Sequence, residues 1–431
     1  MITTRVLVAL AAAVLSAQLA FHARAEDWPT WRGPNGTGIT SERSGWPNGW
    51  PPKRLWGANV GAGCTSPIIA AGSVFTMGWT NDGRGTDTIY CFDAASGREI
   101  WKQSYRCPQQ GRVRIGDTDA YAGPSSTPTF DAAAGLLYTL SIDGDLRCWS
   151  AADNGRLVWA VNLYEQFNVG QRPDSGGGQR DFGYCSSPLL HGDQLIVEVG
   201  STTGTVIAFD KTTGKQLWAS EYNRPAGHSG GIVSIKIGGL QCLALLTLFD
   251  LVVMRADAGF EGRTVATVHR PTHFACNIPT PAAADGCLAV TSGYSQHSTS
   301  LIEFTPAGPV EKWNAGQHAV VSSPVIFSNT IYLLNGALNA LELQTGQRNW
   351  CGGGFGHGSC LATAGDSKLV VFGNRRLALV DAARELREYR ELGQIDTGFA
   401  GTCYPHVALS DGIICCKDRD GNLACFSVRG E

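Results

Sequence analysis

Four histidines recur at related places along the chain, each a short distance before one copy of a repeated motif. They are His228, His273, His318 and His357. Imidazole is a common ligand for transition metals, so four rings gathered around one axis could hold such an ion. Their offsets from the motif differ, however, with six residues for His273 and His318 and fewer for the other two. We therefore interpret them as polar residues at one mouth of the fold and predict no metal site.

Two long connections carry arginines that could bind a polar ligand. They span residues 102–123 and 160–184 and are far longer than the connections later in the chain. Long ordered loops in compact folds tend to carry function. Together with the four histidines they form a candidate face for a protein partner or a polar ligand; a solvated lid without a partner is the alternative. The arginines of this face are Arg112, Arg114, Arg172 and Arg180.

A pair of motifs recurs through the chain and must position these residues. The first is a short segment built on Ser-Ser-Pro, as in CTSPII, CSSPLL and VSSPVI. The second is a hydrophobe, a polar turn with Gly and then a Trp, as in FDAASGREIW and FDKTTGKQLW. The first motif has eight copies, of which SGGIVS and SCLATA are degenerate. The tryptophans that end a repeat are Trp56, Trp101, Trp159, Trp218, Trp313 and Trp350.

Each repeat predicts four short strands, because Gly-rich turns separate runs rich in Val, Ile, Leu and Tyr. Repeated four-stranded units indicate a β-propeller, since one such sheet cannot bury both faces without neighbours. A large, flat Trp suits the wedge between two blades, and the Gly supplies the turn. Two repeats depart from the pattern and carry Ala266 and Tyr389 where a Trp is expected.

The two ends of the chain are expected to share one blade. The last repeat stops at Glu431 without a Trp strand, whereas residues 54–61, which include Trp56, form an unmatched strand before the first repeat. Pairing of the two would close the ring and remove an exposed edge. The prediction is an all-β, eight-bladed β-propeller of four-stranded blades, closed by an N-terminal strand that completes the last blade.

The N-terminus predicts export. Arg5 precedes the apolar run VLVALAAAVLSAQLAF, and ARA before Glu26 fits a small-x-small cleavage site. A membrane anchor is the alternative, but it needs about 20 apolar residues, more than this run supplies. No Cys lies directly after the run, so no lipid attachment is predicted. No other segment is expected to span a membrane. The expected organisation is a signal peptide at 1–25, a strap at 26–53 and the propeller at 54–431.

Charge argues against some classes of partner. The formal net charge is −3, and without Arg5 and Arg24 of the signal peptide it falls to −5. The sequence has no basic stripe, which argues against nucleic acid or anionic lipid as the main partner.

The 14 cysteines suggest disulfides in an exported protein, but the repeats argue otherwise for several of them. One group shares a strand position where other repeats carry Ala or Leu, which is typical of a small buried core residue. A second group shares the first position of the Ser-Ser-Pro motif in non-adjacent repeats, too far apart to pair. We expect few disulfides. The first group is Cys91, Cys148 and Cys425, and the second is Cys64, Cys185 and Cys276.

The repeats resemble the PQQ-like β-propeller repeat, whose pattern FDAASGREIW and FDKTTGKQLW match closely. The lead-in DWPTWRGPNGTGI is similar to that of many exported members related to the outer-membrane assembly factor BamB. The resemblance covers residues 27–431 and implies one of two functions. Quinoprotein dehydrogenases of this fold hold pyrroloquinoline quinone (PQQ) with Ca²⁺ and oxidise alcohols or sugars. BamB-like members hold no cofactor and present loops or strand edges to partners.

The residues implied by the enzyme resemblance are hard to place here. No Asp, Glu and Asn cluster matches the family's Ca²⁺ site, and no CxxCH haem motif occurs. The family often has a vicinal cysteine pair, but Cys415 and Cys416 lie in DGIICCKD, which predicts a strand. Neighbouring strand residues point to opposite faces, so two ordinary core residues are the better interpretation. We assign no catalytic, cofactor-binding or metal residue and predict no cofactor, with PQQ and Ca²⁺ as the alternative.

The function expected from the sequence is an exported, non-catalytic scaffold that binds a protein or a polar ligand on its loop face, as BamB does in outer-membrane assembly. The alternative is a PQQ- and Ca²⁺-dependent oxidoreductase. A deep acidic pocket on the axis would favour the enzyme. A shallow, Arg-rich face without an axial pocket would favour the scaffold. The sequence sets neither the partner nor the oligomeric state.

Overall fold

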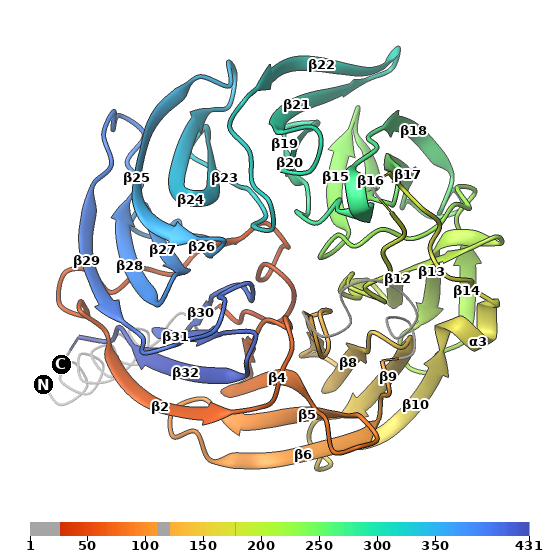
Figure 1. The fold of residues 1–431 in the computed structure, drawn as a ribbon, viewed down its shortest axis with the longest axis horizontal. Helices are drawn as coiled ribbons and strands as arrows, with labels where there is room; N and C mark the ends of the chain where they lie inside the picture. Colours follow the sequence, from red (N-terminus) through yellow and green to blue (C-terminus); the bar gives the residue numbers. More distant parts are fainter. Residues whose placement is uncertain (1–25, 110–120, 177, 431) are drawn as a thin grey trace, which may run out of the picture.

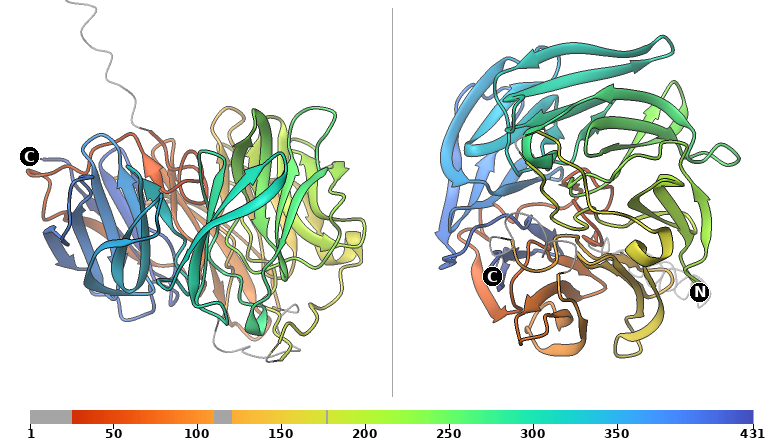
Figure 2. Two further views of the ribbon diagram at one scale, coloured as in Figure 1. Left: turned by 90° about the horizontal axis from the view of Figure 1, so that it is seen from above. Right: turned by 45° about the vertical axis from the view of Figure 1, so that its right-hand side comes forward.

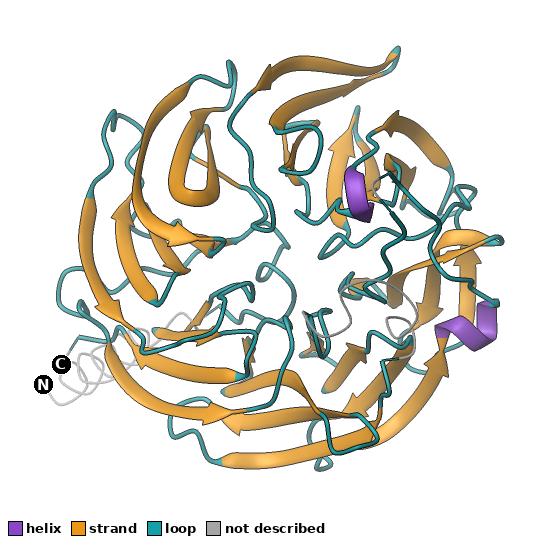
Figure 3. Ribbon diagram, in the orientation of Figure 1, coloured by secondary structure: helices purple, strands orange, loops and turns teal. Residues whose placement is uncertain are grey.

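A computed structural model describes residues 26–109, 121–176 and 178–430 of the chain. Eight β-sheets are arranged around a central axis (Figure 1), and the molecule seen from the side is a flattened disc (Figure 2). Almost all regular structure is strand (Figure 3). The predicted eight-bladed propeller is confirmed. The predicted signal peptide, residues 1–25, lies outside the described residues.

The blades follow one another along the chain, each from the axis outward. Blades one to four are β3 (Ile68–Ala70), β4 (Ser73–Thr80), β5 (Thr86–Asp93) and β6 (Glu99–Arg106); β7 (Thr129–Asp131), β8 (Leu136–Leu140), β9 (Asp145–Ser150) and β10 (Arg156–Asn162); β11 (Leu189–His191), β12 (Gln194–Ser201), β13 (Gly204–Asp210) and β14 (Gln216–Ala219); and β15 (Val233–Ile237), β16 (Leu240–Leu246), β17 (Asp250–Arg255) and β18 (Thr264–His269).

Blades five to eight complete the ring. They are β19 (Ala282–Ala284), β20 (Cys287–Ser292), β21 (Ser298–Thr305) and β22 (Gly308–Ala315); β23 (Val325–Phe327), β24 (Thr330–Glu342) and β25 (Arg348–Gly356); β26 (Ser359–Thr363), β27 (Lys368–Gly373), β28 (Arg376–Asp381) and β29 (Glu391–Asp396), with β1 (Ile39–Thr40) beside β26; and β30 (Ala408–Ser410), β31 (Ile413–Lys417), β32 (Asn422–Ser427) and β2 (Lys53–Asn59). Two short helices, α3 (Leu163–Phe167) and η1 (His273–Ala275), lie in connections.

Blade eight closes the ring as predicted. Strand β2 pairs antiparallel with β32, and Lys53 lies opposite Ser427. Blade six differs from the predicted pattern, because the long strand β24 takes the place of both its second and third strands. The first half of β24 pairs with β23 and the second half with β25, on either side of Gly336.

Four of the repeat tryptophans lock one blade to the next. Trp56 of blade eight donates Nε1–H to the carbonyl of Ala94 in the turn of blade one, at 2.8 Å. The same bond, at 2.9–3.1 Å, recurs from three other tryptophans. The glycine of the receiving turn is needed because a Cβ on Gly97 would lie 2.5 Å from the Trp56 ring. The other donors of this bond are Trp101, Trp159 and Trp313.

Within the described residues, the remaining blades lack this hydrogen bond between a tryptophan and the next blade. Trp218 donates to Gln194 of its own blade, and Ala266 holds the tryptophan position in blade four, as predicted. In blade seven the prediction of Tyr389 is wrong, because Tyr389 precedes β29 and the register places Gly393 opposite Leu379. A Cβ on Gly393 would lie 3.5 Å from Trp50, so a strap indole fills this seam.

The Ser-Ser-Pro motif joins the blades near the axis. The hydroxyl before the proline accepts a backbone N–H from the preceding blade, as in His406 N to Ser66 Oγ at 2.7 Å and Ser66 N to Thr127 Oγ1 at 3.2 Å. Thr127 N continues the series to Ser187 Oγ at 2.9 Å. Blade four lacks the hydroxyl, and there the carbonyl of Gly230 accepts from Ser187 N at 2.9 Å. These bonds satisfy backbone groups that would otherwise be buried without partners.

A β-bulge interrupts the outermost ladder of all eight blades, one residue before the tryptophan position. In blade one it falls at Ile100, between the pairs Cys91–Trp101 and Phe92–Glu99. Bulges twist an edge strand and discourage pairing with another chain.

No helix in the described ranges is both long and apolar enough to span a bilayer.

The contact between Trp56 and Gly97 predicts that Gly97→Ala lowers the free energy of unfolding more than the same substitution at a matched glycine. Gly97 and Gly72 both have left-handed φ angles, +72° and +74°, but a Cβ on Gly72 would meet nothing within 4 Å. Gly72→Ala should cost about 1–2 kcal/mol from backbone strain. Gly97→Ala should cost about 1–3 kcal/mol more, because its methyl group displaces Trp56. Urea unfolding followed by circular dichroism would measure both, and equal costs would contradict the lock.

Candidate functional site

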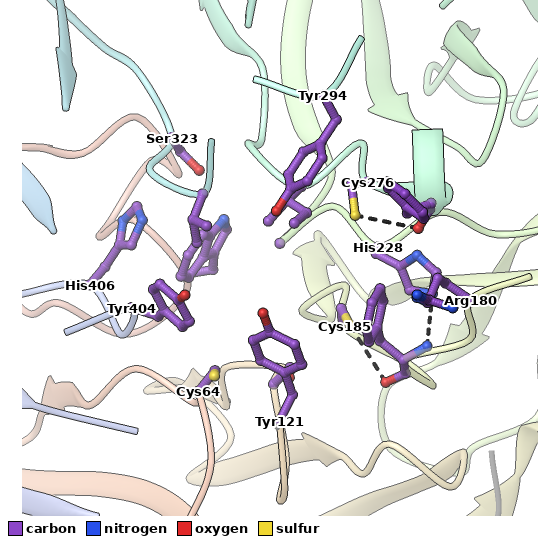
Figure 4. A pocket seen from close by; sticks show the side chains of 17 residues that line it. Cys64, Tyr121, Arg180, Cys185, His228, Cys276, Tyr294, Ser323, Tyr404 and His406 are labelled. Atoms are coloured by element: carbon purple, nitrogen blue, oxygen red, sulfur yellow. Dashed lines mark hydrogen bonds between the residues drawn. The ribbon is translucent and has the colours of Figure 1, made fainter. Parts of the chain in front are cut away.

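A pocket of about 260 Å³ lies on the propeller axis (Figure 4). Six of the 17 described residues that line it hold one repeat position, the first residue of the Ser-Ser-Pro motif. This position lies two residues before the residue that bonds to the next blade. The interblade bonds place His406 as the counterpart of Ser66, and therefore Tyr404 as the counterpart of Cys64. In blade five Thr280 N donates to Ser323 Oγ at 3.0 Å, which places Ile278 at this position and not Cys276 as predicted. In blade four the bridge between Ser187 and Gly231 places Ser229 there, next to His228. The residues that this position contributes to the pocket are Cys64, Ser125, Cys185, Ile278, Val321 and Tyr404.

The N-terminal strap supplies the floor of the pocket. Trp31 donates Nε1–H to Thr280 Oγ1 at 3.1 Å, and its ring centroid lies 4.3 Å from that of His406. Gly230 faces it closely, because a Cβ there would lie 2.6 Å from the indole. The neighbouring Arg32 is buried and donates to the carbonyls of Pro281, Thr37 and Pro324. The strap is thus held across the axis between blades five and six.

Burial changes the ionisation of two groups beside this floor. Desolvation lowers the pKa of Arg32 to about 10 and that of His406 to about 3. Arg32 therefore stays charged at neutral pH, whereas His406 is neutral.

Aromatic rings form a continuous wall above the floor. Tyr121 lies between Phe182 and Tyr404, edge-on to the first at 5.6 Å and stacked on the second at 6.4 Å. Phe182 in turn meets His228 edge-on at 4.9 Å. The hydroxyls of Tyr121 and Tyr294 point into the pocket from opposite sides (Figure 4).

A buried ion pair holds the loop that carries Phe182, and its arginine also donates to the carbonyls of Ala226 and Gly227, next to His228. Arg172 Nη1 lies 2.6 Å from Asp181 Oδ1, and both side chains are at most 5% exposed. Burial alone would raise the pKa of Asp181, but the charge of Arg172 and a hydrogen bond from His228 hold it below its usual range. The backbone N–H of Phe182 donates to His228 Nε2 at 3.2 Å, so His228 presents a fixed face to the pocket.

The predicted partner residues are spread over different environments. His228 and Arg180 line the pocket, and His357 lies beside it, with its ring 6.2 Å from Tyr404. His273 and His318 are not among the residues that line the pocket. Arg172 serves the buried ion pair instead of facing a ligand. Arg112 and Arg114 lie outside the described residues. In the described part of the chain no three His, Cys, Asp or Glu side chains are grouped to hold a metal ion.

The aromatic wall was not predicted from the sequence. A weak signal was available, because Tyr121, Phe182, Phe274 and Tyr404 each lie within four residues of the first motif position. Two copies of the motif hid part of the rest. The prediction placed the cysteines of CNIPTP and CYPHVA at the first motif position, whereas the interblade bonds place Ile278 and Tyr404 there, two residues and one residue later.

Comparisons with known proteins identify the family. Residues 85–351 match the PQQ_2 family model, described as outer membrane protein assembly factor BamB. The chain belongs to this family. Its fold is similar to BamB from Moraxella catarrhalis, with 10% identity and a TM-score of 0.57 over 87% of this chain and 99% of that one.

Dehydrogenases are also similar to this PQQ_2 chain. A europium-containing methanol dehydrogenase matches with 10% identity and a TM-score of 0.64 over 91% of this chain and 90% of that one. Quinohemoprotein alcohol dehydrogenase ADH-IIG of Pseudomonas putida is 26% identical over 157 residues, 36% of this chain and 18% of the enzyme. The chain thus spans less than a fifth of this curated relative. The structural likenesses show the fold and leave the function within the family open.

The axial pocket does not fit the quinone and Ca²⁺ of the dehydrogenase members. PQQ carries three carboxylates, and Ca²⁺ needs six to eight oxygen ligands, largely from carboxylates and carbonyls. The described residues that line the pocket include no Asp, Glu or Asn, and Arg180 is their one guanidinium. Thiols, hydroxyls and rings make up most of the remainder. The pocket therefore matches neither outcome expected from the sequence, since it lies on the axis but is aromatic where an enzyme was expected to be acidic.

A buried carboxyl behind the pocket wall predicts a pH-dependent stability. Burial raises the pKa of Glu198 from 4.5 to about 7, although Gly227 N–H donates to its Oε1 at 2.7 Å. Between these pH values the unfolded chain loses a proton that the folded chain keeps, so stability falls as pH rises from about 4.5 to 7. Glu198→Gln should remove about 1–3 kcal/mol of this decline, because the amide keeps an acceptor oxygen and cannot ionise.

Urea midpoints at pH 5, 6, 7 and 8 would measure this effect. Exposed Glu388→Gln serves as the matched control and should leave the slope unchanged. An unchanged slope in Glu198→Gln would contradict the assignment.

Proposed function

We propose that this PQQ_2 protein is an exported, non-catalytic propeller that binds a protein partner on the face where the axial pocket opens, in the cell envelope. The composition of the pocket carries the proposal. Its described wall is rich in Tyr, Phe and Trp and includes Arg180, the residue types that dominate binding energy at protein interfaces. The family description as an outer-membrane assembly factor and the predicted signal peptide support the location.

The site is rigid, as a docking surface needs to be. Arg172 and Asp181 fix one rim of the pocket from inside, and the series of interblade bonds fixes the motif positions around it. A pre-organised surface loses little conformational entropy when a partner binds. The partner therefore meets an aromatic pocket surrounded by more polar loops, the usual arrangement of core and rim in an interface.

Photo-crosslinking in intact envelopes tests this proposal. p-Benzoylphenylalanine replaces Phe274 or Tyr294 at the pocket, or Phe260, which is 41% exposed on an outer turn of blade four. Adducts of discrete size should form from the two pocket positions and not from the control position, because the partner covers only the pocket face. Equal adducts from Phe260, or none from the pocket, would contradict the proposal.

Titration with PQQ tests the alternative function. The mature chain, residues 26–431, should show no saturable, calcium-dependent quenching of Trp fluorescence, because the described lining offers one guanidinium against three carboxylates. Micromolar or tighter binding that depends on Ca²⁺ would overturn the non-catalytic assignment.

A further inference from the structure

We infer that the axial pocket takes one uncharged aromatic group, a phenol or an indole, presented by a side chain of the protein partner. This inference rests on the proposed function, since it names the chemistry by which the partner is recognised. Ring contacts, hydroxyl positions, charge and size each support it.

The rings of the pocket offer faces and edges to a further ring. Tyr121 already stacks on Tyr404 and meets Phe182 edge-on, so the wall has the geometry in which aromatic groups pair favourably. Trp31 closes the floor with its ring tilted by 41° against that of His406. An entering ring would have aromatic rings on its sides and below it. An aliphatic side chain in the same place would gain no aromatic pairing.

Hydroxyl groups supply a small polar component. Tyr121 and Tyr294 direct theirs into the pocket from opposite sides (Figure 4), and Ser125 and Ser323 add two more to the lining. A phenol O–H or an indole N–H entering the pocket would find an acceptor among them. Hydroxyls are both donors and acceptors, so the pair can adapt to either group.

The charge of the pocket disfavours a cationic occupant. Among the described lining residues no carboxylate is present to pair with a cation. The guanidinium of Arg180 lies 5.3 Å from the centroid of the Phe274 ring, an arrangement that favours aromatic neighbours. A cationic ligand would lose its hydration here and find no carboxylate in the described lining to compensate for that loss.

The size of the pocket limits the occupant to one or two rings. At about 260 Å³ it falls below the range of about 300–1,000 Å³ that is usual for small-molecule and cofactor sites. Trp31 blocks deeper entry along the axis, because the strap is fixed to blades five and six by Arg32. A side chain that reaches in from the open face suits these dimensions better than a tricyclic cofactor.

Fluorine NMR with 5-fluoroindole on the mature chain, residues 26–431, tests the inference. The probe should bind saturably, and 5-fluorotryptamine should bind about tenfold more weakly, because its ammonium group must be desolvated and the described lining has no carboxylate to pair with it. Tyr294→Phe should weaken the neutral probe about 2- to 10-fold through loss of one hydrogen bond. Tyr90→Phe, on β5 away from the axis, is the matched control and should change nothing.

A peptide identifies the source of the aromatic group. A Gly/Ser nonapeptide with a central Trp should displace 5-fluoroindole, and the same peptide with Ala should not. Absence of indole binding, tighter binding of 5-fluorotryptamine, equal losses in Tyr90→Phe and Tyr294→Phe, or failure of the Trp peptide to compete would each overturn the inference. Crosslinks that persist at Phe274 without indole binding would leave the proposed function standing and reject this inference alone.

Discussion

An indole ring from one blade lies where the next blade has no Cβ, and the ring of blades depends on this contact. Trp56 against Gly97 and Trp101 against Gly155 show it in successive blades, each with an Nε1–H bond to a turn carbonyl. The contact is apolar, geometrically specific and repeated, so it sets both the spacing and the rotation between blades. Blade seven lacks this tryptophan, and there Trp50 of the strap packs against Gly393.

The central pocket follows from this spacing. The tryptophans fix the outer part of each seam, and the Ser-Ser-Pro hydroxyls fix the inner part, so the first motif position of many blades faces one space. The repeat thereby converts a single sequence position into a ring of side chains. Cys64 and Cys185 face this space together with Ile278 and Tyr404, so the identity of this one position in each blade contributes to what the axis can bind.

The sequence was sufficient for the fold because the repeat is local. Blade number and the closure by residues 54–61 follow from spacing along the chain, and the structure agrees; the strand count differs only in blade six, where β24 takes the place of two strands. The pocket was harder to predict, because its aromatic residues come from different loops and lie at different offsets from the repeated motif. Tyr389 was misplaced because a longer turn in blade seven shifts the strand that follows. Arg172 looked like a surface cation, and only the fold shows that Asp181 neutralises it inside the protein.

The pairing of β2 with β32 has a consequence for how the molecule forms. Lys53 and Ser427 are neighbours in the ladder although almost the whole propeller separates them along the chain. A chain emerging from synthesis or translocation therefore cannot complete blade eight until its last strand is released, and β2 must wait unpaired until then. Contacts of such high contact order form slowly. Unlike a linear array of repeats, which can fold piecewise from any point, this ring gains its final seams in one late step.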